Sequence, residues 1–252
     1  DNASTPAGIA FTATALAACP TTGRLNYASF ASITSATSSS STAAADYLNY
    51  LRGSRTNELS TTTTSSTRIY RQRDYLLGDI VSSKATDVGP PIAAYHDLYN
   101  AGYSTFKRTY ANRRTVVYAG ANDGMLHAFD GTLPGTVSTI SGDVTTTTTS
   151  DCSFCGQELF AYIPSFVYGT SSTAATSGLA SFGSPTRSHY YQVDATPLEF
   201  DVDISKVCTV GTSSTLAECD KVSTTPDWHT LLIGGLGNDL LDGGIGSNIL
   251  IQ

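Results

Sequence analysis

Five cysteines are the first residues of this sequence whose spacing could do chemistry. Cys152 and Cys155 form a C-x-x-C, which could be a redox pair or half of a zinc site. No second C-x-x-C and no H-x-x-x-H follows. The flanks are a threonine tract and a predicted strand, without the β-α-β context of a redox motif. The sequence therefore favours a short structural disulfide between these two cysteines.

A second pair of cysteines lies further along the chain. Cys208 and Cys219 are eleven residues apart, and the residues between them are rich in Gly, Ser and Thr. Such a segment suits a disulfide that closes a surface loop, so we predict this second bridge. Cys19 is then left over, and it could be a buried free thiol or a cross-link to another chain.

Two Gly-rich nonapeptides near the C-terminal end could bind a metal ion. Residues 234–242 fit G-G-x-G-x-D-x-U-x, and residues 243–251 follow in register with Asn248 in place of the aspartate. This pattern resembles the calcium-binding β-roll of RTX proteins, in which hard oxygen ligands hold Ca²⁺. Asp239 would be the main carboxylate ligand and Asn248 a weaker neutral one. The alternative is a Gly-rich turn between strands, because a β-roll needs about three repeats.

Catalytic motifs are not evident. The sequence contains no G-x-S-x-G elbow for a nucleophilic serine. Asn122 and Asp123 sit in a predicted turn, where an aspartate usually caps backbone N–H groups. His127 and His229 lie inside predicted strands, where a structural histidine is the commoner outcome. We therefore expect a protein that is not an enzyme.

Composition narrows the class of protein further. Only 14% of the residues are charged, the net charge is −7, and long Ser/Thr tracts are present. The negative charge argues against nucleic acid, and without 18 successive apolar residues we predict no membrane span. Low charge and Ser/Thr tracts suit an extracellular glycoprotein, with Asn2 in an N-glycosylation sequon, although flexible loops would look the same. Residues 9–18 lack a basic start, so we expect a mature chain.

The elements that would position these residues are mainly short strands. The strongest signal is 114–131, where two apolar runs flank Asn122-Asp123-Gly124 and predict a hairpin. In 198–204, the apolar residues alternate and should share one face. Residues 68–74 are basic and aromatic. Further strands are predicted at 158–164, 189–194 and 227–235, a helix at 43–52, and a helix or ordered loop at 95–110.

Several of these segments, taken in order, resemble the C-terminal β-propeller domain of PilY-type proteins. These proteins are tip-associated adhesins and biogenesis factors of bacterial type IV pili. The resemblance implies a surface-exposed, non-enzymatic protein that acts in adhesion, pilus assembly and twitching motility. Its partners would be pilus proteins such as minor pilins, or a surface receptor. The matching segments are YLNYLRG (47–53), LGDIV (77–81), VVYAGANDGMLHAFDG (116–131), ELFAYIP (158–164), HYYQVDATP (189–197) and WHTLLIGGLG (228–237).

The resemblance divides the chain into an N-terminal segment (1–45), a partial propeller (46–237) and the RTX-like tail (238–252). The 139 residues from Arg114 to Gln252 would form about three blades, whereas a closed propeller needs about four to eight. We therefore expect an incomplete β-propeller-like fold with short helices, whose open sheet edges something must cover. A truncated product is one explanation. The other is a self-assembling filament or matrix subunit, in which 248–252 could add a strand to a neighbouring copy.

Two further resemblances are weaker. The family's calcium loop is not transferred to Asp201-Val202-Asp203, because the following residues lack the glycine and the distant glutamate such a loop needs. The hairpin also resembles the blade repeat of quinoprotein dehydrogenases. Those enzymes hold their cofactor in a complete propeller, and Cys152 and Cys155 are not the adjacent pair that such sites often use.

Overall fold

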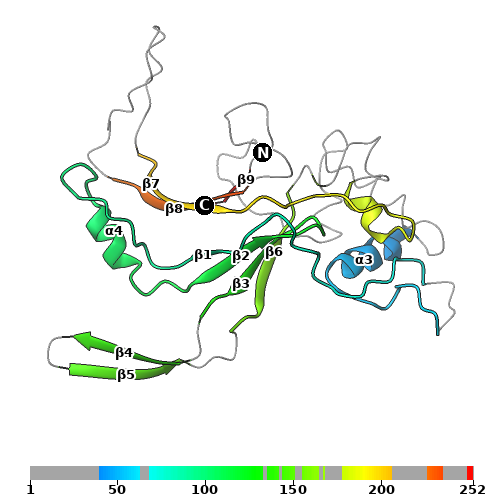
Figure 1. The fold of residues 1–252 in the computed structure, drawn as a ribbon, viewed down its shortest axis with the longest axis horizontal. Helices are drawn as coiled ribbons and strands as arrows, with labels where there is room; N and C mark the ends of the chain where they lie inside the picture. Colours follow the sequence, from blue (N-terminus) through cyan, green and yellow to red (C-terminus); the bar gives the residue numbers. More distant parts are fainter. Residues whose placement is uncertain are drawn as a thin grey trace, which may run out of the picture. The chain divides into compact units, whose positions relative to one another are not determined.

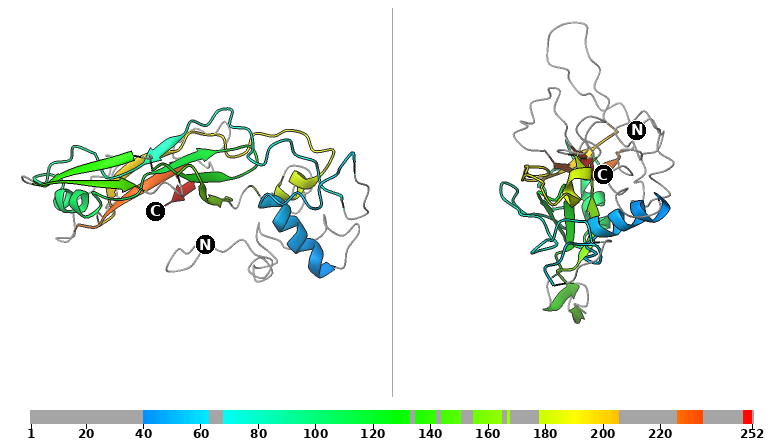
Figure 2. Two further views of the ribbon diagram at one scale, coloured as in Figure 1. Left: turned by 90° about the horizontal axis from the view of Figure 1, so that it is seen from below. Right: turned by 90° about the vertical axis from the view of Figure 1, so that its right-hand side faces the viewer.

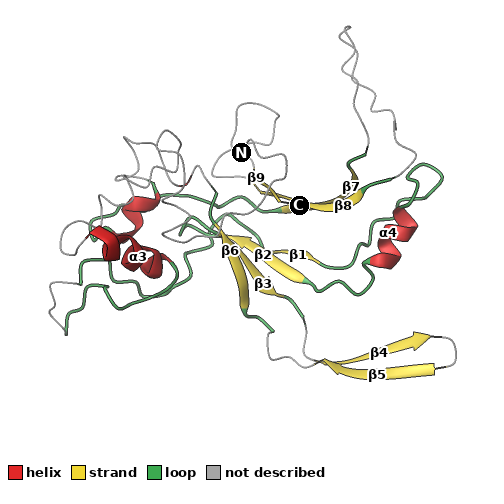
Figure 3. Cartoon of the chain, turned by 180° about the vertical axis from the view of Figure 1, so that it is seen from behind, coloured by secondary structure: helices red, strands yellow, loops and turns green. Residues whose placement is uncertain are grey.

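The structure is a computed structural model that falls into two compact units. Unit 1 comprises Asp1–Asp79, Asn122–Met125 and Ile163–Gln192, and unit 2 comprises Ile80–Ala121, Leu126–Tyr162 and Val193–Gln252. Figures 1 and 2 show the elements along the chain, and Figure 3 shows their types. The described residues are 40–62, 68–132, 135–141, 144–150, 155–164, 167, 178–205, 226–234 and 249–251.

Unit 1 is organised around the helix α3 (Ser40–Leu51), which confirms the helix predicted at 43–52. Tyr47, Leu48 and Leu51 are buried on the face that the i, i+1, i+4 spacing brings together. The helix is followed by Gly53, whose φ of 102° lies in the left-handed region that suits a helix end. The buried face meets the 3₁₀ turn η2 (Leu179–Gly183), as the blue and yellow segments show (Figure 1).

A cluster of tyrosines forms the centre of unit 1. The ring of Tyr47 lies 5.9 Å from that of Tyr50 and 5.3 Å from that of Tyr70. The Tyr47 hydroxyl donates to the Leu179 carbonyl at 2.7 Å and accepts from the Gly183 N–H at 3.0 Å. Burial raises the pKa of Tyr47 and raises the pKa of Tyr70 to about 12, so both rings stay neutral.

Unit 2 contains a four-stranded antiparallel sheet in the order β1-β2-β3-β6. The strands are β1 (Thr86–Val88), β2 (Val116–Gly120), β3 (Leu126–Asp130) and β6 (Glu158–Tyr162). The predicted hairpin is confirmed, with Val116 opposite Asp130 and Gly120 opposite Leu126. β3 is a central strand between β2 and β6, and Leu126, His127 and Ala128 are all buried.

Between β3 and β6 the chain forms a separate two-stranded sheet. This hairpin consists of β4 (Gly135–Ser141) and β5 (Val144–Ser150), which pair from Gly135 opposite Ser150 to Ser141 opposite Val144 (Figure 3). The threonine tract at 145–149 is therefore β5, a strand that the sequence analysis did not predict. β-branched threonine favours strands, and that propensity was the available signal.

A third sheet follows in the order β7-β8-β9, again antiparallel. It contains β7 (Leu198–Asp203), β8 (Trp228–Gly234) and β9 (Ile249–Ile251). β9 pairs with β8 of the same chain, with Gly234 opposite Ile249. The hypothesis that 248–252 adds a strand to a neighbouring copy is therefore not supported, because β9 pairs with β8 of its own chain.

The apolar side of β7 is the more exposed side. Leu198 and Phe200 are each 45% exposed, whereas Asp201 and Asp203 are buried. Asp201 accepts hydrogen bonds from the Tyr103 hydroxyl at 2.6 Å and from Thr230 Oγ1 at 2.7 Å. The alternation was predicted correctly, but the acidic face turns inward because its carboxylates find donors there.

Aromatic residues pack on this inward face of β7 and β8. The helix α4 (Tyr103–Thr109) lies within the aromatic stretch predicted as a helix or ordered loop at 95–110. The Tyr103 and Trp228 rings are 4.8 Å apart, and Phe106 lies 6.3 Å from Trp228. Core packing is therefore the role of these aromatic residues, in line with their helical spacing.

The fold is thus mainly β with short helices, as predicted. None of the three sheets closes on itself among the described residues, and a propeller arrangement stays a prediction. Within the same ranges, no helix has the length and apolar character to cross a membrane.

Replacing Tyr47 with Phe should destabilise unit 1 by about 1–3 kcal/mol, because the substitution leaves the Leu179 carbonyl and the Gly183 N–H without their buried partner. Urea unfolding monitored by tyrosine fluorescence would measure the change. Tyr75→Phe is the matched control, since that side chain is 83% exposed and should change nothing. Equal stability of the two variants would contradict the proposed role of the Tyr47 hydroxyl.

Replacing Gly124 with Ala in the hairpin turn should cost about 1–3 kcal/mol. Its φ is 85°, and a Cβ there would lie 2.7 Å from Val167 Cγ1. Gly156→Ala is the control, because Gly156 has a φ of 72° but no atom within 4 Å of the added Cβ. Chemical unfolding should show the larger loss for Gly124→Ala. The same loss in both variants would mean that the contact with Val167 does not matter.

Candidate functional site

Unit 1 contains a cavity of about 290 Å³ whose walls are rich in arginine, aspartate and aromatic residues. Its lining comes from the end of α3, the loop 71–79, the hairpin turn 122–125 and the segment 182–189. Several segments that are distant in the sequence therefore contribute to one cavity. This is the concave site with convergent polar groups that ligand binding requires.

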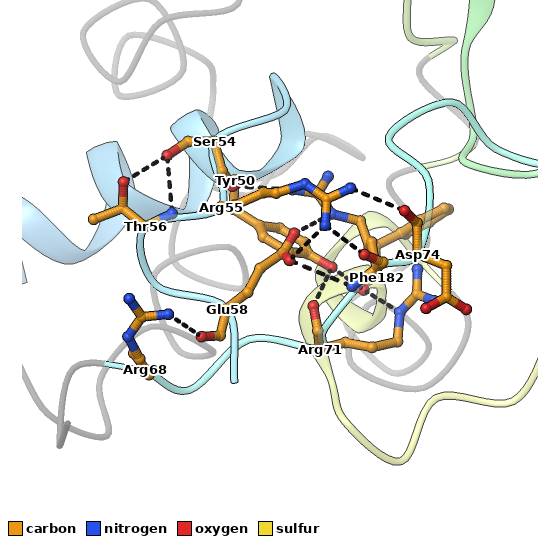
Figure 4. A network of polar contacts seen from close by, with 10 residues as sticks. Tyr50, Ser54, Arg55, Thr56, Glu58, Arg68, Arg71, Asp74 and Phe182 are labelled. Carbon is orange, nitrogen blue, oxygen red and sulfur yellow. Dashed lines mark hydrogen bonds and ion pairs between the residues drawn. The ribbon is translucent and has the colours of Figure 1, made fainter. Parts of the chain in front are cut away.

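Arg73 lines the cavity and forms a buried ion pair with Glu58 (Figure 4). Glu58 is 3% exposed, and its Oε1 accepts from Arg73 Nε at 2.6 Å. Arg73 also donates through Nη2 to the Ser54 carbonyl at 3.0 Å. Arg55 adds a second cation, 3.6 Å from Glu58 Oε2. A buried carboxylate needs such partners, so this network is structural and holds the loop to the end of α3.

Tyr50 connects this ion pair to the cavity. The Arg73 guanidinium lies 3.9 Å from the centre of the Tyr50 ring. The Tyr50 hydroxyl donates to the carbonyls of Arg71 and Phe182, at 3.3 and 3.2 Å. Arg71 Nε donates to the same Phe182 carbonyl at 3.4 Å (Figure 4). These bonds fix the backbone on which Arg71 and Phe182 present their side chains.

A second stacked arginine lies on the cavity wall. The Arg187 guanidinium is 3.9 Å from the centre of the Phe182 ring. Its Nε and Nη2 atoms are buried, and no described residue accepts a hydrogen bond from them. Burial, together with the nearby charge of Arg71, lowers the pKa of Arg187 below its ordinary value. Arg187 thus brings positive charge to the cavity without a bonded counter-ion.

The hairpin turn supplies the acidic part of the cavity. Asn122 Nδ2 donates to Asp79 Oδ2 at 2.8 Å, and His189 Nε2 lies 3.0 Å from the same oxygen. Asp123 accepts from the Gly78 N–H at 2.8 Å and the Met125 N–H at 3.2 Å. The interpretation of Asp123 as a cap for backbone N–H groups is confirmed.

Residues 189–194 do not form the predicted strand. The Gln192 N–H donates to Asn122 Oδ1 at 3.1 Å, and His189 contacts Asp79. The chain is therefore held by side chains of the turn and of the loop before it, and these bonds replace a strand ladder. The prediction of a strand here is wrong for that reason.

Opposing effects set the pKa of Asp79, whose side chain is 52% exposed. Its burial alone would raise the pKa, but the hydrogen bonds from Asn122 and His189 outweigh that effect and lower the pKa below the ordinary range. Asp79 is therefore ionised at neutral pH and serves as the acceptor that joins the turn to the segment 189–192.

The histidines have structural partners. His127 is 5% exposed, with Nδ1 2.6 Å from Glu158 Oε1, and His229 Nε2 lies 2.8 Å from Asp227 Oδ1. His96 accepts from the Leu98 N–H through Nδ1 at 3.2 Å. The described part of the chain holds no group of three or more His, Cys, Asp or Glu side chains that could bind a metal ion. The described histidines therefore support the local structure through hydrogen bonds.

Most of the predicted site residues lie outside the described part of the chain. These are the calcium ligands Asp239 and Asn248, together with Cys19, Cys152, Cys208 and Cys219. Cys155 is described, is half-buried, and takes part in a disulfide. The pairings Cys152–Cys155 and Cys208–Cys219 and the calcium site stay predictions.

Sequence reasoning missed the arginines of the cavity as a site. The basic and aromatic character of 68–74 was visible, and it does mark the wall formed by Arg71 and Arg73. Arg187 gave no signal, because it stands alone in a loop more than a hundred residues further on. Only the fold places it over Phe182 at the same cavity.

The lowered pKa of Asp79 predicts a pH-dependent contribution to stability. A carboxylate whose pKa is lower in the folded state stabilises the fold above the unfolded pKa of about 3.9, and this stabilisation is lost as the pH falls through the folded value. Asp79→Asn should therefore melt at a lower temperature than the wild type at pH ~7, and the difference should shrink below about pH 4. Thermal melting across this range is the measurement.

Asp74→Asn provides the control for the Asp79 variant, because Asp74 also lines the cavity and is similarly exposed, but no described residue donates a hydrogen bond to its carboxylate. Its melting temperature should match that of the wild type throughout. A constant difference between Asp79→Asn and the wild type at every pH would show that the carboxylate charge is not what stabilises the turn.

Comparison with known proteins points to one group of relatives. The chain is 30% identical over 171 residues to the type IV pilus biogenesis factor PilY1 homolog of Xylella fastidiosa (66% of this chain, 10% of the relative). It is 32% identical over 175 residues to the type IV pilus biogenesis factor PilY1 of Pseudomonas aeruginosa strain UCBPP-PA14 (67% of this chain, 11% of the relative).

No family model and no solved structure matches the chain. The chain spans about a tenth of the length of the curated relatives it matches. The similarity to PilY1 factors covers about two thirds of the chain, and it supports a PilY1-like family for this protein.

Proposed function

We propose that this chain is part of a non-enzymatic, surface-exposed bacterial protein that acts in type IV pilus biogenesis or pilus-associated adhesion. The observation that carries the proposal is the similarity of about two thirds of the chain to PilY1 factors. The filament hypothesis has no such support, since its donated strand pairs within the chain.

The contacts within unit 1 add support to this proposal. Three segments that resemble the PilY family, 77–81, 116–131 and 189–197, bond to one another around the turn. The Asn122 N–H donates to the Asp79 carbonyl at 3.0 Å, Gly78 bonds to Asp123, and His189 contacts Asp79. The resembling residues are therefore the ones that hold this part of the fold together, as expected for a shared structure.

We further propose that the two larger sheets are propeller blades. Propeller blades are four-stranded antiparallel sheets, and β1-β2-β3-β6 has that number and sequential order of strands. The sheet β7-β8-β9 repeats the antiparallel sequential order with three strands. The β4–β5 hairpin would then be an insertion before the last strand of the first blade.

The proposed partners are proteins of the pilus machinery, at the cell surface. A blade sheet offers edges and loops for protein contacts, and the polar groups of the cavity are arranged for binding. In this proposal the chain contributes a binding module, and the rest of the pilus-associated protein supplies further domains.

An in-frame deletion of residues 46–234 in the encoding bacterium tests the proposal. The expected result is a loss of surface pili and of surface adhesion of at least about tenfold, the scale of a lost specific interaction. Electron microscopy of pili, twitching zones and adhesion assays would measure the loss. Reintroduction of the intact gene should restore all three.

Immunoblots of cell and sheared-surface fractions would show that the shortened protein is still made. A loss of adhesion with normal pilus numbers would assign the chain to adhesion, and a loss of both would assign it to biogenesis. Wild-type pili, twitching and adhesion in a strain that makes the shortened protein would refute the proposed function.

A further inference from the structure

We propose that the cavity of unit 1 is a binding site for an acidic peptide segment of a partner protein. In this proposal, a peptide carboxylate binds to Arg187 and Arg71, and the apolar neighbours of the carboxylate pack on Tyr75, Leu76 and Leu77. This site goes beyond the proposed function. Its ligand is defined by a carboxylate with apolar neighbours.

Two arginines that stack on aromatic rings in unit 1 differ in their counter-ions. Arg73 lies 3.9 Å from the Tyr50 ring centre, and Arg187 lies 3.9 Å from the Phe182 ring centre. Arg73 has the carboxylate of Glu58 at 2.6 Å. Arg187 has no carboxylate bonded to it in the described part of the chain, and its buried Nε and Nη2 have no acceptor. Arg73 therefore has a bonded carboxylate, whereas the similarly stacked Arg187 has none among the described residues.

Buried donors without an acceptor are costly for a protein to maintain, and Arg187, although only partly buried as a residue, has two such nitrogen atoms. Arginine carries five N–H donors and stays charged, and a ring face attracts the cation but supplies no carboxylate-like acceptor. Native proteins usually satisfy buried donors, so an exception calls for an explanation such as an absent ligand. An anion in the adjoining cavity would supply the counter-charge after a small rotation of the Arg187 side chain.

Arg71 makes the same corner of the cavity more positive. It lines the cavity with Arg187, and its charge contributes to the lowered pKa of Arg187. Its Nε donates a long hydrogen bond of 3.4 Å to the Phe182 carbonyl. Two guanidinium groups that repel each other are well placed to share one carboxylate, which accepts paired N–H···O bonds from arginine.

The remaining charges favour a carboxylate over a phosphate or a nucleic acid. Asp74, Asp79 and Asp123 line the same cavity. These acids would repel a dianion more strongly than a single carboxylate. The net charge of −7 adds a general repulsion of polyanions.

The apolar rim favours a peptide over a small free acid. Tyr75 is 83% exposed, Leu76 48% and Leu77 43%, and all three line the cavity. Three successive exposed apolar side chains beside the Arg71 and Arg187 corner of the cavity match the pattern of an anchor residue with flanking apolar contacts. A small free carboxylate would leave this surface uncovered.

Fluorescence anisotropy of the full chain with a dye-labelled, capped peptide of sequence Leu-Asp-Leu-Glu-Leu would test the site. The matched probe has Asn and Gln in place of the two acids. We expect saturable binding of the acidic probe that weakens with added salt, and at least about tenfold weaker binding of the neutral probe. Arg187→Gln should weaken binding of the acidic probe by at least about tenfold.

Arg68→Gln is the matched control, because Arg68 belongs to the same unit and donates to the Glu58 carbonyl but does not line the cavity. Its affinity for the acidic probe should stay within about twofold of the wild type. Arg187→Lys serves if Arg187→Gln does not fold, and it should bind less tightly than the wild type because lysine lacks the planar fork. Equal binding of both probes, wild-type affinity in the folded Arg187 variant, or displacement of the peptide by an equal concentration of inorganic phosphate would overturn the proposal.

Discussion

The corner at Asn122 and Asp123 is the constraint on which unit 1 depends. All the side-chain polar atoms of these two residues form hydrogen bonds. Asn122 bonds to Asp79 and to the Gln192 N–H, and Asp123 accepts from the N–H groups of Gly78 and Met125. Asn122 is 3% exposed. Because the Asn122 side chain is buried, losing one of its bonds leaves a buried polar group without its partner, which costs free energy. The cavity exists because this corner fixes the loop before it and the segment after it.

The same rule, that buried polar groups must find partners, decides the orientation of elements elsewhere in the chain. Tyr47 joins α3 to η2 through its hydroxyl, and Glu58 joins the loop after α3 to Arg73. In unit 2, the inward-facing Asp201 receives hydrogen bonds from Tyr103 and Thr230. Apolar burial supplies much of the free energy of folding, but in each case the polar bond determines which of several apolar packings is adopted.

Local sequence patterns predicted the secondary-structure elements better than they predicted the tertiary contacts of each element. The Asn-Asp-Gly corner and the helix 43–52 were predictable, because turn geometry and helical spacing are properties of a few successive residues. The orientation of β7 could not be predicted. Whether its apolar or its acidic face is buried depends on Tyr103, about a hundred residues earlier in the chain. The irregular path of 189–194 could not be predicted for the same reason, because the Gln192 N–H bonds to Asn122, which is distant in the sequence.

The candidate site was less predictable than the fold. Arg71 and Arg73 stood out in a basic, aromatic stretch, but nothing local indicated that Glu58 neutralises one of them and not the other. Arg187 belongs to the site only through its position over Phe182. A cavity of this kind is a property of the assembled segments, whereas the nonapeptides and cysteine pairs that the sequence offered as sites are local patterns.

The β4–β5 hairpin has a consequence for how this part of the chain can evolve. The hairpin occupies the connection between β3 and β6, yet β3 and β6 pair directly, from Leu126 opposite Tyr162 onward. The strand pairing is therefore set without it, and lengthening a surface connection costs little free energy. Selection can alter the length or composition of this hairpin while the sheet keeps its register. Chains that share the sheet can therefore differ greatly at this point, and the hairpin offers a tolerant position for carrying an inserted epitope or label.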